Sequence, residues 1–229
     1  MSFDLKLHAY RLLMDEPFFA ALSRKIEKRA CTAIPTAGVR VDPDTAQFEM
    51  IYNPDFFASL PEEHVRGVLK HEFYHLIFEH VTSRKPEGVN HKVWNICADL
   101  AINSHLVGEL PDMACMPGGP NFEELPKGKS AEWYLANFPE RPEDDGEGEG
   151  DGEGEPGEPG DEAGNGQPSD GNPGSFDDHS GWDDANASPE QQAANQMAKE
   201  RLKNAMKEAA GEAAQSVKGW GSVSGEVKK

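Results

Sequence analysis

The stretch VLKHEFYHLIFEH, residues 68–80, decides how the rest of the chain is interpreted. Its two histidines, His71 and His75, are four residues apart, so on a helix both imidazoles project from one face, about one turn apart. A single Zn²⁺ can therefore bind both side chains. Glu72 lies beside them and is placed to take a proton from a metal-bound water. Apolar residues around the motif suit a helix whose back face packs in a core, so we predict a catalytic zinc helix here.

A histidine nine positions after His71 is one candidate for the third metal ligand. On a continuous helix, His80 would lie about 180° round from His71. The helix should run to about residue 81 or 82, because no Gly or Pro lies between His75 and His80. We therefore expect His80 on the core face, hydrogen-bonded to a backbone carbonyl or to a polar group of the neighbouring helix. It stays the alternative ligand.

The preferred third ligand is Asp99, in a second helix expected at about residues 91–107. Asn95, Asp99 and Asn103 follow one another at four-residue spacing and form one polar stripe on an otherwise apolar helix. A buried carboxylate is costly unless a cation lies beside it. We predict that Asp99 completes the metal site and that Asn95 and Asn103 support it by hydrogen bonding. Arg84, in the loop between the two helices, either orients substrate or is a surface arginine.

The net charge of −19 is concentrated in one segment. Residues 143–190 carry 17 Asp/Glu and no Lys/Arg, whereas residues 1–142 carry a net charge of only −5. The part at 143–175 consists almost wholly of Asp, Glu, Gly, Pro, Asn and Ser, which cannot bury enough apolar surface to balance the chain entropy lost on folding. We predict a disordered acidic linker there. A broad basic face for nucleic acid is disfavoured.

Cysteine usage and the first residues indicate the compartment. Cys31, Cys97 and Cys115 are odd in number and have no CxxC spacing, so we expect reduced thiols rather than a disulfide framework. The N-terminus lacks the basic-then-apolar layout of a signal peptide, and no apolar run approaches membrane-spanning length. We expect a cytoplasmic protein without a membrane partner.

Periodicity outlines the remaining elements. Apolar residues at helical spacing predict two helices within residues 3–30, with a break at Pro17. Two β-rich stretches, 36–42 and 46–53, flank a turn and predict a hairpin. Residues 188–216 predict a polar helix whose apolar positions are mostly Ala and Met, so we expect it to pack weakly and to need a partner.

Together, residues 68–80 and the segment WNICADLAIN at residues 94–103 resemble the putative metallopeptidase domain of bacterial and phage proteins. The resemblance covers about residues 5–140. In that family the domain usually precedes a von Willebrand factor A-like domain. Asp99 follows His75 by 24 residues, close to the separation at which thermolysin-like enzymes place their third ligand. The resemblance implies bound Zn²⁺ and a zincin-type fold, in which a mixed sheet lies over the active-site helix.

We therefore expect an α+β chain in three parts: a zincin-like metallopeptidase domain at 1–142, the acidic linker at 143–175 and a polar helical tail at 176–229. Because the linker supplies no core, the first part should fold without the rest. The predicted chemistry is zinc-dependent hydrolysis of a protein or peptide, with Glu72 as general base.

Two alternatives stay open. The same site could cleave an amide in a non-protein substrate, such as a cell-wall peptide. The chain could instead be a catalytically idle, metal-stabilised scaffold that binds a protein partner through its linker and tail. Three protein ligands with one open position favour an enzyme, whereas four protein ligands favour the scaffold.

Overall fold

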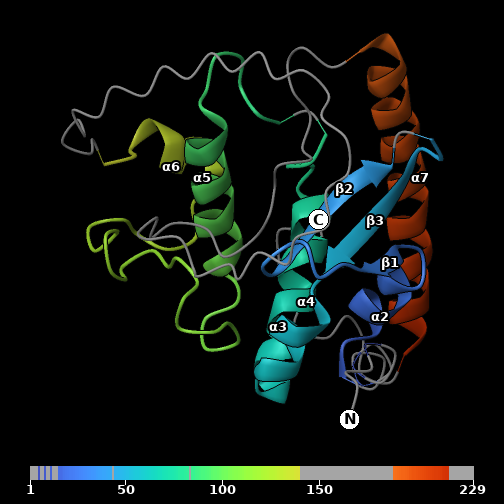
Figure 1. The fold of residues 1–229 in the computed structure, drawn as a ribbon, viewed down its shortest axis with the longest axis horizontal. Coiled ribbons are helices and arrows are strands. Elements are labelled where there is room, and N and C mark those ends of the chain that lie inside the picture. Colours follow the sequence, from blue (N-terminus) through green and yellow to red (C-terminus); the bar gives the residue numbers. More distant parts are fainter. Residues whose placement is uncertain are drawn as a thin grey trace, which may run out of the picture.

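Helices surround a small three-stranded sheet in the computed structural model of the chain, which gives a mixed α+β architecture (Figure 1). The structure describes residues 5, 8, 11, 15–42, 44–82, 84–139 and 188–216. The helices are α2 (Pro17–Ser23), α3 (Pro54–Ser59), α4 (Glu62–Ile77), α5 (His91–Asn103), α6 (Ala131–Ala136) and α7 (Pro189–Gln215). The strands are β1 (Glu27–Ala30), β2 (Ala37–Asp42) and β3 (Gln47–Tyr52). The predicted acidic linker and the rest of the predicted tail lie outside the described residues.

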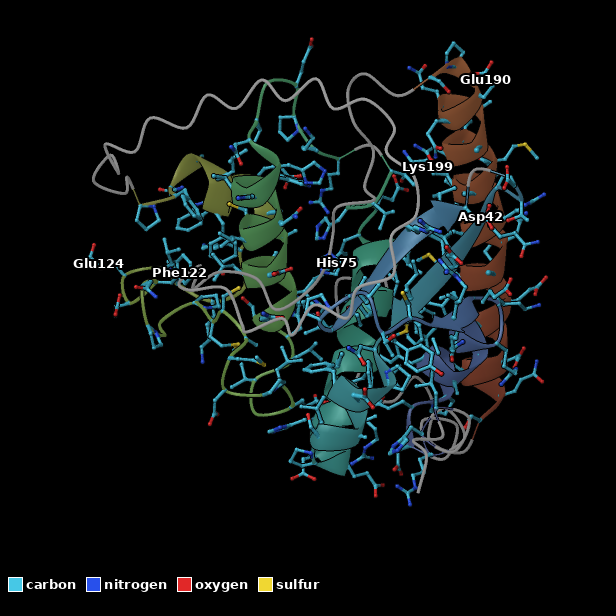
Figure 2. All side chains as sticks on the ribbon, in the orientation of Figure 1. Asp42, His75, Phe122, Glu124, Glu190 and Lys199 are labelled. Carbon is cyan, nitrogen blue, oxygen red and sulfur yellow. The ribbon has the colours of Figure 1, made fainter. Side chains whose placement is uncertain are left out.

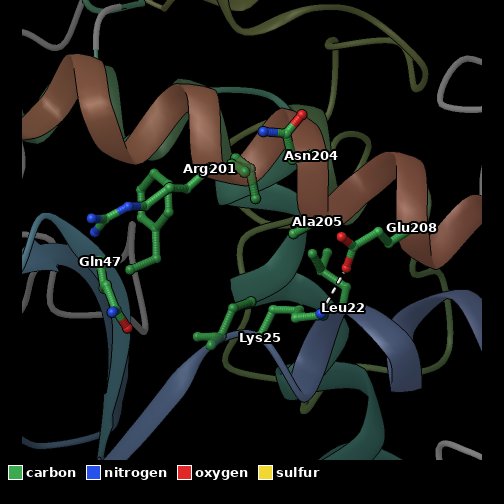
Figure 3. Close-up of a pocket in the computed structure, with 10 residues that line it drawn as sticks. Leu22, Lys25, Gln47, Arg201, Asn204, Ala205 and Glu208 are labelled. Carbon is green, nitrogen blue, oxygen red and sulfur yellow. Dashed lines mark ion pairs between the residues drawn. The ribbon is translucent and has the colours of Figure 1, made fainter.

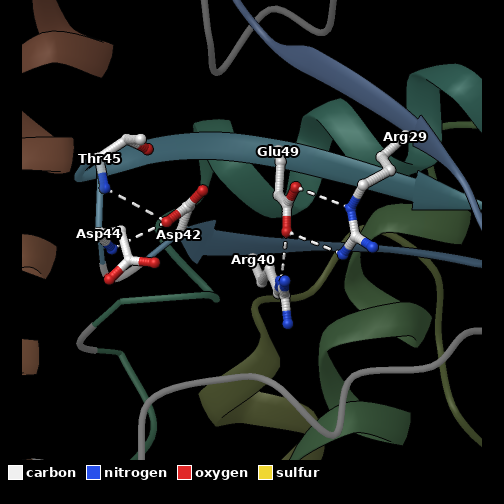
Figure 4. Close-up of polar contacts among 6 residues, drawn as sticks. All are labelled: Arg29, Arg40, Asp42, Asp44, Thr45 and Glu49. Carbon is white, nitrogen blue, oxygen red and sulfur yellow. Dashed lines mark hydrogen bonds and ion pairs between the residues drawn. The ribbon is translucent and has the colours of Figure 1, made fainter.

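A hairpin forms the larger part of the sheet, as the sequence predicts. β2 and β3 pair antiparallel, with Val39 opposite Met50, and both of these side chains are buried in the core. The Asp42 carboxylate closes the turn by accepting the backbone N–H groups of Asp44 at 2.8 Å and Thr45 at 3.2 Å (Figure 4). These two hydrogen bonds lower the pKa of Asp42.

The third strand, β1, corrects the prediction of helix up to residue 30. Residues 27–30 are helix formers by composition, but the chain leaves α2 at Ser23 and pairs parallel with β3, giving the strand order β1-β3-β2. Glu49 of β3 is buried and accepts hydrogen bonds from Arg29 of β1 at 3.3 Å and Arg40 of β2 at 2.5 Å (Figure 4). One carboxylate therefore joins all three strands.

The predicted metal helix, α4, lies at the centre of the molecule and contacts α2, α5, α7 and β2. Two acidic residues in its first turn, Glu62 and Glu63, suit the positive end of the helix dipole. A close approach depends on Gly67, since a Cβ there would lie 1.9 Å from the carbonyl oxygen of Glu109. That carbonyl belongs to the loop after α5, so Gly67 lets this loop rest directly on α4.

The end of α4 contradicts the sequence-based prediction. We expect a helix to residue 81 or 82, yet α4 stops at Ile77. Glu79 adopts a left-handed conformation with φ 58°, its N–H donates to Leu76 at 3.0 Å, and the N–H of His80 donates to His75 at 2.9 Å. This is the hydrogen-bond pattern of a Schellman motif, with a glutamate where glycine is usual. The chain therefore turns back at residue 79, without the Gly or Pro on which the prediction relied.

The described part of the predicted tail is the helix α7, and it packs more closely than expected. Figure 1 shows it running along α2 and the sheet. Its buried residues are mostly small and form a seam along the helix: Ala194, Asn195, Ala198, Leu202, Ala209 and Ala213. The helix contacts α2, β2, β3 and α4. Polar contacts add to this seam. Arg24 and Lys25, directly after α2, form ion pairs with Glu212 and Glu208 of α7. The division of the chain into three separate parts remains a prediction.

A cavity of about 260 Å³ lies where α7 crosses α2 and β3 (Figure 3). The ion pair between Lys25 and Glu208 lies at its side, and Arg201 donates from α7 to the carbonyl oxygens of Thr45 and Ala46 at 2.6 and 2.7 Å. The cavity therefore lies in the interface through which α7 packs on the rest of the fold. Of the helices in the described part of the chain, none is long and apolar enough to cross a membrane.

Gly67→Ala should destabilise the fold, and Gly211→Ala in α7 is its matched control. The added methyl at Gly67 collides with backbone, and overpacking of this kind costs about 1–3 kcal/mol or more. No atom lies within 4 Å of a Cβ at Gly211, so alanine there should stabilise the helix by about 0.5–1 kcal/mol. Urea unfolding measures both. Equal midpoints for the two variants would contradict the close approach at Gly67.

Leu202→Ala tests whether α7 belongs to the core. Leu202 is 6% exposed, and losing a buried leucine side chain typically costs about 2–5 kcal/mol. Met197 on the same helix is 51% exposed, so Met197→Ala should change the free energy of unfolding by less than about 0.5 kcal/mol. The measurement is thermal or urea unfolding of the full chain. If Leu202→Ala is as mild as its control, α7 is not integrated into the fold.

Candidate metal centre

Three ionisable side chains meet where α4 faces α5. His71 and His75 come from consecutive turns of α4 and Asp99 comes from α5, and the cluster is completely buried. The Nε2 atoms of the two histidines are 2.8 Å apart. Oδ1 of Asp99 lies 3.6 Å from Nε2 of His71 and 3.2 Å from Nε2 of His75. Figure 2 shows His75 between the two helices, so the structure brings together the three residues that the sequence singles out.

The spacing of these atoms fits a metal ion. In the plane of these three atoms, the point equidistant from them lies about 1.9 Å from each. An ion slightly above that plane would lie at the bond lengths of about 2.0–2.2 Å that zinc has with histidine nitrogen or carboxylate oxygen. Two imidazole nitrogens and one carboxylate oxygen are also a common donor set for a divalent transition metal. Among the described residues, this is the one group of three His, Cys, Asp or Glu side chains with such spacing.

His71 is held in place by Asn103, one of the predicted supporting residues. Nδ1 of His71 lies 2.7 Å from Oδ1 of Asn103, and Nδ2 of Asn103 donates to the backbone carbonyl of Cys115 at 2.7 Å. Because an amide oxygen can only accept, the imidazole carries its proton on Nδ1 and presents the lone pair of Nε2 to the cluster. The chain after α5 therefore positions a residue of α4 through Asn103.

His80 lies beside the cluster, not on the opposite face of the helix as predicted. Its Nδ1 is 3.3 Å from Nδ1 of His75, and its ring is buried. The early end of α4 is the cause, because the left-handed Glu79 turns the chain back over the last helical turn. His80 contacts His75 on the side away from the cluster and is not one of the three clustered ligands.

The other predicted residues have different surroundings. Glu72 is completely buried in α4, between the two histidines in sequence. Asn95 is partly buried on α5, one turn before Asp99. Arg84 pairs with Glu132 of α6, with Nη2 and Oε2 3.0 Å apart, and donates to the carbonyl of Phe78 at 3.1 Å. Its guanidinium therefore joins the end of α4 to α6.

A buried cation next to His71 was not anticipated from the sequence. Lys70 of α4 is 2% exposed, and its ammonium lies 3.3 Å from Glu16 and pairs with Glu109 of the loop after α5. It also lies 5.9 Å from the ring centre of Phe19. A basic residue inside an apolar helical pattern is the signal that could have indicated this site, since buried lysines need a partner.

The cysteines are free thiols, as predicted. Cys97 is buried near the cluster on α5. Burial, followed by the negative charge of Asp99, raises the pKa of Cys97 to about 12, so this thiol stays protonated at neutral pH. Cys115 contributes its backbone carbonyl to Asn103, and its sulfur lies 3.8 Å from Nδ2 of the same amide.

A buried His–His–Asp cluster in a mixed α+β fold defines the chain as a candidate metalloprotein. The chain belongs to the family described as the putative metallopeptidase domain, whose model matches residues 2–229. It is also similar to a Thermotoga maritima protein described as uncharacterized, with 27% identity over 62 residues. The matched part is 27% of this chain and 16% of the Thermotoga protein. No solved structure matches the chain.

Asp99→Ala should reduce metal affinity by orders of magnitude, because it removes the one charged ligand of a buried cluster. The exposed Asp112 gives a matched control, and Asp112→Ala should bind metal like the wild type. Metal content after gel filtration and competition with a chelator measure the difference. Wild-type affinity in Asp99→Ala would exclude Asp99 as a ligand.

Proposed function

We propose that the chain is a zinc-dependent metallopeptidase of the zincin type, with His71, His75 and Asp99 as metal ligands. The observation that carries this proposal is the buried triangle of two Nε2 atoms and one Oδ1 atom, whose centre matches zinc bond lengths. Membership of the metallopeptidase family supports a protein or peptide as substrate. The strand β2, at an edge of the sheet and in contact with α4, supports the zincin type of fold.

In this proposal, some side chains bind the metal and another transfers a proton. A zinc ion bound by this set would lower the pKa of a water molecule and polarise the substrate carbonyl. Neutral imidazoles are required for this, and Asn103 keeps the Nδ1 proton of His71 in place so that its Nε2 is available. The buried Asp99 carboxylate would balance part of the charge of that cation.

Glu72 is the residue we assign to proton transfer. It follows His71 directly on α4, and its carboxylate is completely buried. A buried carboxylate beside a metal site can accept the proton of the attacking water and then pass it to the leaving amine. Three protein ligands would leave one position of a four-coordinate zinc ion for water or substrate, and this count supports an enzyme over an idle scaffold.

Glu72→Gln should retain one equivalent of zinc and the wild-type stability while losing hydrolysis by about 10²–10⁴-fold, because the amide cannot take a proton. Glu63→Gln makes the same change at an exposed position of the same helix and should leave the rate unchanged. The assay is digestion of a proteome-derived peptide library followed by mass spectrometry. Undiminished cleavage by zinc-loaded Glu72→Gln would reject the role of Glu72.

A further inference from the structure

We propose that His80 is a positioning residue that orients the metal ligand His75 through a hydrogen bond between their Nδ1 atoms. The inference rests on the proposed metal site and adds a residue to it. The contact distance is 3.3 Å, and both rings are buried. Their centres are 5.3 Å apart with an interplanar angle of 67°, so the rings meet edge to face. This arrangement directs a ring nitrogen of His80 at the edge of His75 that faces away from the cluster.

The backbone explains why these two side chains meet. In a Schellman motif, the second residue after the helix cap folds back towards the third residue before it, and a hydrophobic contact between the two side chains is frequent. Here the cap is Phe78, the left-handed residue is Glu79, and the residues that fold together are His80 and His75. Two imidazoles therefore occupy positions that are usually apolar. The turn that ends α4 therefore places the polar ring of His80 next to His75.

The possible tautomers decide the direction of the hydrogen bond. Nε2 of His75 faces Asp99 and His71, so a neutral His75 that ligates a metal there must carry its proton on Nδ1. Nδ1 of His80 lies 3.3 Å from this nitrogen and can accept the proton, in the tautomer of His80 that carries its own proton on Nε2. A donor on the outer nitrogen of a ligating histidine is the usual way in which proteins fix the ring and raise its basicity.

The ring of His80 is itself held by aromatic neighbours. Trp94 of α5 lies edge to face with it, with ring centres 6.0 Å apart, and Phe78 is 5.8 Å away. Outside the motif, Lys199 of α7 lies 3.3 Å from the carboxylate of Glu79 and supports the turn. These contacts restrict the ring to one orientation, which a positioning residue requires.

The two histidine ligands are thus oriented by partners from different parts of the chain. Asn103 accepts from His71, and His80 accepts from His75. The first partner comes from the end of α5 and the second from the turn after α4. Loss of such a partner typically weakens metal binding by about 10–100-fold without removing a ligand.

Two substitutions separate the hydrogen bond from the packing. His80→Asn places an amide oxygen near the position of Nδ1 but removes most of the ring, so it keeps the acceptor and loses packing against Trp94. His80→Phe fills the ring volume but offers no acceptor. Zinc affinity is measured by competition with a chromogenic chelator, and the visible absorption bands of the Co²⁺-substituted protein report the ligand geometry.

We expect His80→Phe to bind zinc about 10–100-fold more weakly than the wild type and to shift the Co²⁺ bands. His80→Asn should bind zinc within a few-fold of the wild type, even where its melting temperature is lower. If His80→Asn does not fold, His80→Asp takes its place, because its Oδ1 is also bonded to Cγ and offers an acceptor near the position of Nδ1. A merely structural role predicts the reverse order, with the phenylalanine variant close to wild type, and that result would overturn the inference.

The controls keep this inference distinct from the proposed function. A wild-type chain that binds no zinc overturns both. A wild-type chain that binds one equivalent, together with unchanged affinity and spectrum in His80→Phe, overturns the role of His80 alone. Complete metal loss in both His80→Phe and His80→Asn, as expected of His71→Ala, would show that His80 is a ligand and would also overturn its role as a positioning residue.

Discussion

Burial of the Asp99 carboxylate between α4 and α5 is the constraint on which the centre of the molecule depends. An ionised carboxylate removed from water costs several kcal/mol unless a cation lies beside it. Its neighbours in the cluster are two imidazoles, one of which has its proton directed to Asn103. Neutral imidazoles cannot balance a full negative charge, whereas a divalent cation can. If the proposed site binds a metal, Asp99 links that binding to the packing of α5 on α4, and the stability of this interface should follow metal occupancy.

The three clustered side chains come from the helices α4 and α5, not from loops. Other contacts hold these two helices in place against each other. Gly67 allows the loop after α5 to lie on α4, and the buried Lys70 joins α4 to that same loop through Glu109. On the other face, the Asn103 amide ties His71 to the carbonyl of Cys115. The chain that follows α5 thus contacts α4 both at its back and beside the ligands.

The sequence predicts those features that depend on local periodicity, and fails where tertiary contacts or unusual backbone decide the conformation. Four-residue spacing of His71 and His75, and the polar stripe that contains Asp99, determine which side chains can meet when two helices pack. Residues 27–30 could not be recognised as a strand, because their composition favours helix and only pairing with β3 makes them extended. The end of α4 depends on a left-handed Glu79, a conformation that costs a non-glycine residue about 1–2 kcal/mol and has no sequence signal.

The helix α7 is mostly polar and still packs on the fold, and the free energies of its contacts explain why. Its ion pairs with Arg24 and Lys25 join half-exposed groups, and each is worth only about 0–1 kcal/mol. The alanines and Leu202 are buried instead, and because alanine loses no side-chain freedom on folding, a seam of small residues binds at little entropic cost. A count of large apolar residues therefore underestimates how strongly such a helix packs. Lys199 of the same helix contacts Glu79 in the turn that presents His80 to His75, so α7 also packs against the end of α4 beside the His–His–Asp cluster.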